Sequence, residues 1–400
     1  MKYAKHNMTT LSVVIPAYNE EKGIADIVKR VLATKHELQK IGVKLSEVIV
    51  VDDGSKDKTA SIARNIRGVK VISHPNNKGY GAAVKTGFDN ADSQLIGFID
   101  ADGTYPPEYF PQLCASIAEG FQLVTGSRMI RADSKMPLLR RIGNVFFAAL
   151  LTIIGRQKIT DSASGMRVFR REILKRLYPL PDGMNLTPVM TMKAVFEKIR
   201  MTEIGISYSE RLGRSKLNAL SDGGAFFESV VYAALGYNPA RILGIAGIAA
   251  EAVAVLIFIA VVILRLRGIA SLDPWGIASV FIMLVASITG ISIFCLGIIA
   301  NYMVGLFNIK YVRPRLFGHQ IFKSQIDIHF CWLGILMLLG GVGIGITSLV
   351  LGLHGWNIDR TWFYLLGSAM LILIGVQLIN YWVILRVLSS LKNTMGGKND

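Results

Sequence analysis

The first half of the chain alternates short apolar runs with longer amphipathic stretches. One helical pattern runs to about Lys40, and others cover residues 58–66, the stretch after residues 76–81, and residues 107–119. The apolar runs have the length of buried strands and lie at residues 11–15, 47–51, 69–72, 95–99 and 122–126. Uninterrupted apolar strands that alternate with helices are typical of a parallel sheet covered on both faces. We therefore predict an α/β fold with a mainly parallel sheet and helices on both faces.

Four apolar stretches in the second half are long enough to cross a membrane. A helix needs roughly twenty residues to span the hydrocarbon core of a bilayer. The stretches are residues 242–264, 276–302, 329–352 and 361–386. They predict an all-α transmembrane domain of four helices. The expected order is a soluble domain, an amphipathic juxtamembrane helix, the transmembrane domain and a tail, at residues 1–220, 221–240, 241–388 and 389–400.

A shorter apolar stretch at residues 138–155 allows two interpretations. Its apolar part of about thirteen residues is too short to span a bilayer. Arg140 and Arg141 lie at its start, as in a helix that rests on a membrane surface. An ordinary core helix is an equally good interpretation.

The charges fit a soluble part beside a membrane part. The 400 residues are 52% hydrophobic and carry a net charge of +16, although residues 241–400 contain only 11 Lys and Arg against 5 Asp and Glu. A basic domain beside a membrane favours anionic headgroups and phosphorylated substrates. We expect no nucleic-acid partner, because the sequence has no binding motif and no alternation of basic and aromatic residues. Cys114, Cys295 and Cys331 are too few and too scattered for a disulfide framework or a zinc site.

The distribution of charge also predicts an orientation. The loop of residues 303–328 carries four Lys and Arg residues between Lys310 and Lys323, whereas residues 353–360 carry one. Since positive loops stay in the cytosol, we expect this loop, the first domain and the tail to be cytosolic. The first ten residues lack the apolar region of a signal peptide. The sequence thus predicts a multi-pass protein of the plasma membrane, and Glu251 in the first span is interpreted as a packing residue.

Polar side chains follow three of the predicted strands. Tyr18 and Glu20 follow the first, Asp53 follows the second, and Asp100 and Asp102 follow the fourth. Ligands bind at the carboxyl ends of the strands in such sheets, so we expect these side chains to surround one site. Asp100 and Asp102 can hold one Mg²⁺ or Mn²⁺ and leave open positions for the phosphates of a substrate. The alternative is a pair of solvated loop aspartates.

Seven motifs between residues 10 and 220 resemble those of one known family, in the same order. They are Val14-Ile15-Pro16-Ala17-Tyr18-Asn19-Glu20, Val51-Asp52-Asp53-Gly54-Ser55, Asn77-Lys78-Gly79-Tyr80-Gly81-Ala82-Ala83, Asp100-Ala101-Asp102 with Pro106-Pro107-Glu108, Gly126-Ser127-Arg128, Asp161-Ser162-Ala163-Ser164-Gly165-Met166-Arg167 and Arg211-Leu212-Gly213-Arg214-Ser215-Lys216. The chain resembles the family 2 glycosyltransferases of the GT-A fold, especially the dolichyl- or polyprenyl-phosphate sugar synthases. Each motif is weak alone, but the ordered set is specific.

The resemblance implies a membrane-bound hexosyltransferase that moves a sugar from a UDP- or GDP-sugar to a polyprenyl phosphate, with a divalent metal and with inversion. The residues that match the family's donor-nucleotide site are Pro16, Ala17, Tyr18, Glu20, Asp53, Lys78, Asp100 and Ala101. Asp100 and Asp102 match its metal and diphosphate site. Thr104 departs from the family pattern, which often has Gln at this position.

The chemistry of such a transfer assigns roles to further residues. A departing diphosphate develops negative charge, which a cation at Asp102 and an arginine can stabilise. Arg128 follows a strand end and is the arginine we favour. The residues expected to bind the acceptor phosphate are Arg128, Arg140, Arg141, Arg211, Arg214 and Lys216. Asp161 is the candidate base if the acceptor is a hydroxyl, and otherwise it orients neighbouring side chains.

Two other functions remain open from the sequence. One is a glycolipid synthase that transfers to a lipid hydroxyl. A processive polysaccharide synthase is disfavoured, because the chain has no Gln-x-x-Arg-Trp motif. The other is a catalytically inactive membrane scaffold, against which the intact pair Asp100 and Asp102 argues. A homo-oligomer is compatible with all of these readings.

Overall fold

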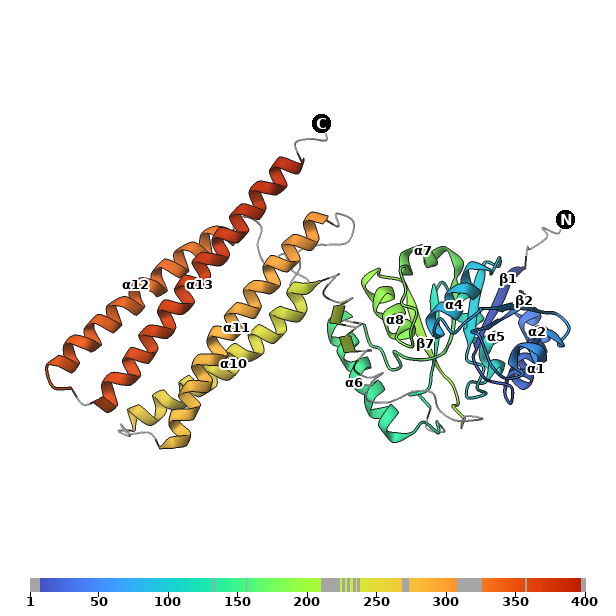
Figure 1. The fold of residues 1–400 in the computed structure, drawn as a ribbon, viewed down its shortest axis with the longest axis horizontal. Coiled ribbons are helices and arrows are strands. Elements are labelled where there is room, and N and C mark those ends of the chain that lie inside the picture. The colour runs from blue at the N-terminus through green and yellow to red at the C-terminus, as the bar shows by residue number, and fades with distance from the viewer. Residues whose placement is uncertain are drawn as a thin grey trace. The chain divides into compact units, whose positions relative to one another are not determined.

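The computed structural model describes residues 8–131, 134–155, 157–209, 238–267, 273–307, 326–356 and 358–396, with a few residues between 224 and 235. The chain forms two compact units, Met1–Ala233 and Ala234–Asp400 (Figure 1). The predicted boundary at residue 220 and most of the predicted juxtamembrane helix at 221–240 lie outside the described residues.

The N-terminal unit is built on a seven-stranded sheet. Its strands are β1 (Thr9–Ala17), β2 (Val43–Asp52), β3 (Val69–Ser73), β4 (Leu95–Ile99), β5 (Leu123–Ser127), β6 (Met166–Arg170) and β7 (Met201–Gly205). Their spatial order is β3-β2-β1-β4-β6-β5-β7, and all neighbouring pairs are parallel except the two that β6 makes. The predicted mainly parallel α/β sheet is confirmed. Two strands were not predicted: β6 lies between β4 and β5, and β7 forms the edge beside β5.

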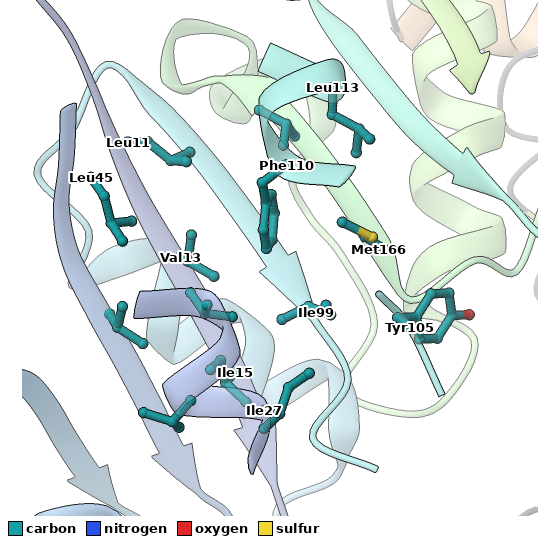
Figure 2. Packing of buried hydrophobic residues seen from close by; sticks show 14 of the residues in the cluster. Leu11, Val13, Ile15, Ile27, Leu45, Ile99, Tyr105, Phe110, Leu113 and Met166 are labelled. Carbon is teal, nitrogen blue, oxygen red and sulfur yellow. The ribbon is translucent and has the colours of Figure 1, made fainter. Parts of the chain in front are cut away.

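One face of the sheet is covered by α1 (Ile24–Ala33), α2 (Lys35–Lys40), α3 (Thr59–Arg64) and α5 (Phe110–Ala118). Alternate residues of a strand point to opposite faces. Leu11, Val13 and Ile15 of β1 therefore share this side, where they are fully buried in one cluster with Ile27 of α1 (Figure 2). The buried residues of α1 recur at three- and four-residue spacing, as one face of a helix requires.

The opposite face carries α4 (Tyr80–Asp89). A Cβ at Gly87 would lie 2.1 Å from Val14 Cγ1, so only glycine lets α4 approach β1 this closely. Phe88 of α4 packs edge-to-face on Phe98 and Phe169, with ring centroids 5.7 and 5.1 Å apart. These contacts fix the position of α4 on the sheet. Further helices of this unit are α7 (Leu174–Leu177) and α8 (Leu186–Phe196).

Helix α6 (Leu138–Gly155) has one buried and one exposed side. Asn144, Ala148 and Leu151 are buried. The large apolar side chains that are at least 52% exposed are Leu138, Leu139, Ile142, Val145, Phe146 and Ile153. A core helix would bury these residues, so the core-helix interpretation is wrong for this side. An exposed apolar patch of this kind marks a surface for a membrane or a protein.

The C-terminal unit contains four long helices, α10 (Pro239–Leu266), α11 (Pro274–Phe307), α12 (Ile326–Leu353) and α13 (Ile358–Gly396). Each contains a segment that is long and apolar enough to cross a membrane, so the four predicted spans are confirmed. Helix α13 continues beyond residue 388, where the predicted transmembrane domain ends.

Small and polar residues join α10 to α11. A Cβ at Gly247 would lie 2.6 Å from Gly290 O, so the two backbones are in close contact. One helical turn further along α10, Glu251 accepts a hydrogen bond through Oε1 from Ser287 Oγ at 3.0 Å. This bond between the two helices supports the packing role predicted for Glu251.

Candidate active site

A cavity of about 360 Å³ lies where β1, β2 and β4 end. Its lining residues are Pro16, Ala17, Tyr18, Glu20, Asp53, Asn77, Gly79, Tyr80, Ala83, Asp100, Ala101, Asp102, Gly183 and Met184. The volume is in the range of small-molecule sites. Every residue expected at the donor site lines this one cavity except Lys78, whose side chain is exposed.

Asp53 shapes the cavity through the main chain that follows β3. Its Oδ1 accepts a hydrogen bond from the Lys78 amide and its Oδ2 accepts one from the Gly79 amide, both at 2.9 Å. His74 Nδ1 lies 2.7 Å from the same Oδ1. Both carboxylate oxygens of this buried aspartate therefore hold the turn before α4 against the end of β2.

The start of α4 contacts a loop between α7 and α8. A Cβ at Gly81 would lie 2.2 Å from Pro181 O, and a Cβ at Gly79 would lie 2.5 Å from Asp182 O. Main chain therefore packs directly on main chain at this wall. The contact brings Met184, which is 39% exposed, into the lining of the cavity.

Asp100, directly after β4, is oriented by two segments that are distant in sequence. Tyr80 donates its hydroxyl to Asp100 Oδ1 at 2.8 Å. Burial and the neighbouring carboxylate raise the pKa of Tyr80 well above its ordinary value, so the hydroxyl stays a donor. A Cβ at Gly165 would lie 2.2 Å from Asp100 Oδ2, so the main chain of Gly165 lies against the carboxylate.

Asp102 is oriented within its own turn. The amide and the hydroxyl of Thr104 both donate to Asp102 Oδ1, at 3.1 and 2.6 Å. Thr104 is buried, and Gly103 between the two residues has a φ of 76°, which favours glycine. Threonine at the position where the family often has Gln therefore has a defined role here.

Asp100 and Asp102 fit a divalent metal that is held together with a diphosphate. Both line the same cavity, and carboxylate oxygens are the ligands that Mg²⁺ and Mn²⁺ prefer. Within the described ranges, no group of three His, Cys, Asp or Glu side chains could hold a metal. Two carboxylates that share a metal with substrate phosphates are a common arrangement for Mg²⁺.

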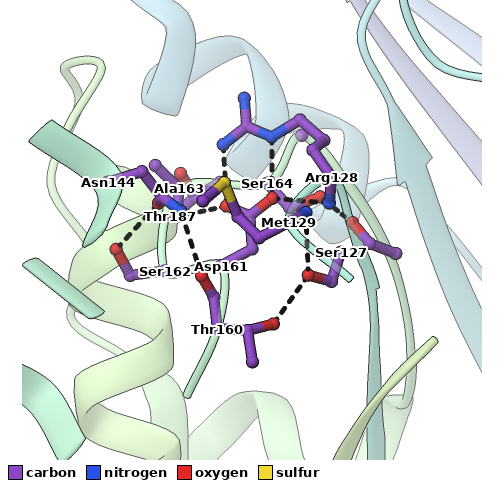
Figure 3. Close-up of polar contacts among 12 residues, drawn as sticks. Ser127, Arg128, Met129, Asn144, Thr160, Asp161, Ser162, Ala163, Ser164 and Thr187 are labelled. Carbon is purple, nitrogen blue, oxygen red and sulfur yellow. Dashed lines mark hydrogen bonds and ion pairs between the residues drawn. The ribbon is translucent and has the colours of Figure 1, made fainter. Parts of the chain in front are cut away.

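Arg128, directly after β5, is held by Asp161 (Figure 3). Its Nε and Nη2 donate to Asp161 Oδ2 and Oδ1, each at 2.7 Å, and its amide donates to Oδ2 at 2.9 Å. Burial acts to raise the pKa of Asp161, but the Arg128 guanidinium outweighs it and holds this pKa below its ordinary value. Asp161 is thus an ionised partner of Arg128, a geometry that suits the orienting role better than the role of a base.

Tyr105 connects the Arg128 pair to Asp100. Its ring and that of Tyr208 lie 5.8 and 5.4 Å from Arg128 Cζ. The Tyr105 hydroxyl accepts a hydrogen bond at 2.7 Å from the amide of Gly165, the residue that lies against Asp100. The Nη1 atom of Arg128 points away from Asp161 (Figure 3). The pair with Asp161 therefore uses Nε and Nη2 and leaves the Nη1 side of the guanidinium facing away from the carboxylate.

Arg167 of β6 belongs to the same region and was not predicted. It is fully buried, and its Nε and Nη2 donate to the carbonyls of Ser164 and Ser162 at 3.2 and 2.8 Å. Burial lowers its pKa to about 10. Arginine within the apolar run Met166–Arg170 could have identified it, because arginine is rarely buried without a partner.

Among the described residues, none of the cations expected at the acceptor site lines this cavity, and Arg128 reaches it only through Tyr105 and Gly165. Arg140 and Arg141 lie in the first turn of α6 and do not line it. Arg211, Arg214 and Lys216 lie outside the described residues. Of the predicted phosphate-binding cations, Arg128 is therefore the one that the described structure joins to the donor site.

Two family models match the two units separately. Residues 12–178 match the glycosyl transferase family 2 model, and residues 239–395 match a domain of unknown function, DUF8752. A dolichyl-phosphate hexose transferase of Haloferax volcanii is 32% identical over 227 residues, which are 57% of this chain and 95% of that protein. An undecaprenyl-phosphate 4-deoxy-4-formamido-L-arabinose transferase of Proteus mirabilis is 29% identical over 317 residues, which are 78% of this chain and 93% of that protein.

A solved structure also matches the chain. Glucosyl-3-phosphoglycerate synthase from Mycobacterium tuberculosis, in complex with Mn²⁺, uridine-diphosphate and glucosyl-3-phosphoglycerate, is 26% identical with a TM-score of 0.44, and the match covers 57% of this chain and 79% of that one. The transferase relatives and the four apolar helices make the chain a multi-pass membrane enzyme. The chain belongs to glycosyltransferase family 2.

Proposed function

We propose that this glycosyltransferase moves a sugar from a nucleoside diphosphate sugar to the phosphate of a polyprenyl phosphate, with inversion. The observation that carries the proposal is that two carboxylates lie at the donor cavity and a partly buried arginine lies near them. Asp100 and Asp102 line the donor cavity, and Tyr105 lies between Arg128 and Gly165, the residue against Asp100. Arg128 is thus a positioned cation for a second anion. The names of the Haloferax and Proteus relatives support a polyprenyl phosphate as that anion.

The transfer needs no proton to be removed. A phosphate oxygen of the acceptor forms a bond to the anomeric carbon, the bond from that carbon to the diphosphate breaks, and the nucleoside diphosphate leaves with the electron pair. A phosphate monoester is already an anion at neutral pH. A lipid hydroxyl would need a base instead. Because both oxygens of Asp161 bind Arg128, the geometry favours the phosphate acceptor over the lipid hydroxyl.

Asp100 and Asp102 would hold the divalent metal, which supplies positive charge to the departing diphosphate. Tyr80 and Thr104 keep the two carboxylates oriented by donating their hydroxyls. Asp53 holds the turn that forms one wall of the donor cavity. These residues thus bind and orient the donor before transfer.

The exposed side of α6 supports an acceptor at a membrane surface. Its apolar side chains, among them Ile142 and Phe146, suit the boundary between headgroups and acyl chains. On the buried side, Asn144 Nδ2 donates to Thr160 O at 3.0 Å, next to Asp161. A polyprenyl phosphate keeps its anionic head at the headgroup level, so this helix would present that head to the Arg128 region.

We propose that the transferase unit lies on the cytosolic side of the plasma membrane.

The purified full chain should be incubated with Mg²⁺ or Mn²⁺, a panel of UDP- and GDP-sugars, and undecaprenyl phosphate in vesicles. The expected product is a lipid-linked sugar phosphodiester that mild acid cleaves. Equal transfer to unphosphorylated polyprenol or to diacylglycerol would support a glycolipid synthase instead. Failure to bind any nucleotide sugar would support an inactive scaffold.

The acceptor assignment is tested separately by Arg128→Lys. Lysine keeps the charge but cannot reproduce the bidentate pair with Asp161. The KM for undecaprenyl phosphate should rise about tenfold or more, in line with the loss of a charge-assisted contact, while the KM for the donor changes little. An unchanged KM for the lipid would remove Arg128 from the acceptor site.

A further inference from the structure

Glu203 of β7 is a partly buried carboxylate that takes no part in the reaction proposed above. Within the part of the chain that the structure describes, its hydrogen bonds come from two neighbouring residues of one loop. Oε2 accepts from the amide and the hydroxyl of Thr160, at 2.8 and 2.6 Å, and Oε1 accepts from the amide of Asp161 at 3.0 Å. A buried carboxylate is costly unless such donors satisfy it. The three bonds therefore identify this loop as the partner of Glu203.

Three elements hold Thr160 in place. Ser127 Oγ of β5 lies 2.7 Å from Thr160 Oγ1, and Asn144 of α6 donates to the Thr160 carbonyl. Glu203 is the residue that binds the amides of both Thr160 and Asp161. It therefore sets the direction of the main chain from which the Asp161 side chain departs.

The position of Asp161 determines the position of the Arg128 guanidinium. The two side chains share a bidentate pair, and Asp161 also accepts the Arg128 amide. The pair is buried, with 0% of the Asp161 side chain and 11% of the Arg128 side chain exposed. In so enclosed a site, a shift of the loop moves the carboxylate and the guanidinium together.

We propose that Glu203 is a positioning residue for the acceptor phosphate, acting through Asp161 on the guanidinium of Arg128. The proposal rests on the proposed function, in which Arg128 binds that phosphate. Glu203 touches no reacting group. It binds the amides of Thr160 and Asp161. The Asp161 side chain in turn orients the guanidinium of Arg128.

The test is Glu203→Gln in the purified full chain. Glutamine keeps the size of the side chain but replaces one acceptor oxygen with an NH₂ donor, so a loop donor loses its acceptor. The KM for undecaprenyl phosphate should rise about tenfold, while the KM for the nucleotide sugar changes by less than about twofold, as expected for a change that reaches one subsite. An equal rise in both KM values, or none, would overturn the proposal.

Glu197→Gln is the matched control. The Glu197 side chain is 5% exposed and pairs with Arg176 at 3.5 Å, so this variant also alters a buried carboxylate. It should leave the KM for the lipid unchanged even where it lowers the thermal midpoint. A rise equal to that of Glu203→Gln would mean that general destabilisation explains both. If Glu203→Gln does not fold, Thr160→Val removes the hydroxyl that binds both Glu203 and Ser127, and Ser127→Ala removes only the second of these two contacts. Thr160→Val should raise the same KM more than Ser127→Ala does, and equal KM values for the two variants would count against the proposal.

A double-mutant cycle with Arg128→Lys identifies the route of the effect. If Glu203 acts through Arg128, Glu203→Gln should add less than about twofold in the Arg128→Lys background, because interacting residues are not additive. Multiplicative effects would overturn the proposal. If Arg128→Lys alone leaves the KM for the lipid unchanged, the acceptor assignment fails. If it raises that KM and Glu203→Gln does not, only the positioning role fails.

Discussion

A side-chain hydroxyl donates to each of the two carboxylates at the donor cavity. Tyr80 donates to Asp100 and Thr104 donates to Asp102, and Thr104 is only 1% exposed. A carboxylate that is oriented before the substrate arrives needs no rearrangement during transfer, and such preorganisation is a main source of catalysis. At the scale of residues, Tyr80 and Thr104 therefore belong to the proposed metal site together with the two carboxylates that they orient.

Asp102→Asn should reduce turnover about a hundredfold or more, the usual effect of losing one preorganised electrostatic group. EDTA should do the same to the unsubstituted enzyme, and added Mg²⁺ or Mn²⁺ should restore it. Initial rates of lipid-linked sugar formation measure both effects. Full activity of the variant in EDTA would exclude a metal at this position.

Thr104→Val removes the hydroxyl that Asp102 accepts and keeps the shape of the side chain. The metal concentration for half-maximal rate should rise about tenfold, within the range measured for residues that orient metal ligands. Thr104→Ser keeps the hydroxyl and should stay close to the unsubstituted enzyme. Equal behaviour of the two variants would show that the hydroxyl has no role.

Side chains directly after a strand could be predicted from the sequence, whereas those brought in by tertiary contact could not. Asp53 and Asp100 follow apolar runs, and parallel strands carry such residues to one edge. Met184 reaches the cavity only because glycines of α4 admit its loop. Glu203 lies on a short strand with mixed polarity, so neither its strand nor its partners have a sequence signature.

At the scale of elements, two glycines have different consequences. Gly87 lets α4 pack on β1, while Gly165, directly before β6, lies against the Asp100 carboxylate. β6 escaped prediction because its five residues include two arginines, yet it runs antiparallel to both neighbours and brings Gly165 to the end of β4. The strand that the sequence pattern did not reveal is thus also the one that brings Gly165 to Asp100.

Gly87→Ala should destabilise the fold, and Gly165→Ala should impair the chemistry. The Cβ in Gly87→Ala would overlap Val14, and overpacking of a core costs about 1–3 kcal/mol. The Cβ in Gly165→Ala would meet a carboxylate that Tyr80 holds. Gly87→Ala should therefore lower the thermal midpoint more than the rate of transfer. Gly165→Ala should lower the rate more than the thermal midpoint, and both quantities can be measured on the purified variants. A fully active Gly165→Ala enzyme would contradict this placement of Asp100.

At the scale of the whole molecule, the four spans and their loop charges are the basis of the proposed orientation in the membrane. Ser324→Cys, in the loop of residues 303–328 and outside the described residues, should resist an impermeant maleimide in intact cells and react after lysis. Burial raises the pKa of Cys114 to about 12, so that thiol should stay unreactive at neutral pH. The parent chain without the substitution gives the background, and labelling in intact cells would reverse the proposed orientation.

The main-chain wall at Gly79 and Gly81, where the start of α4 meets the loop before α8, limits how the donor cavity can be re-engineered. Carbonyls of Pro181 and Asp182 form this wall, and no side chain there can be exchanged for a smaller one. Any side chain added at either glycine would push the loop away from α4. Room for a different donor therefore has to be made elsewhere in the lining, and Met184 offers an adaptable side chain at the mouth of the same loop.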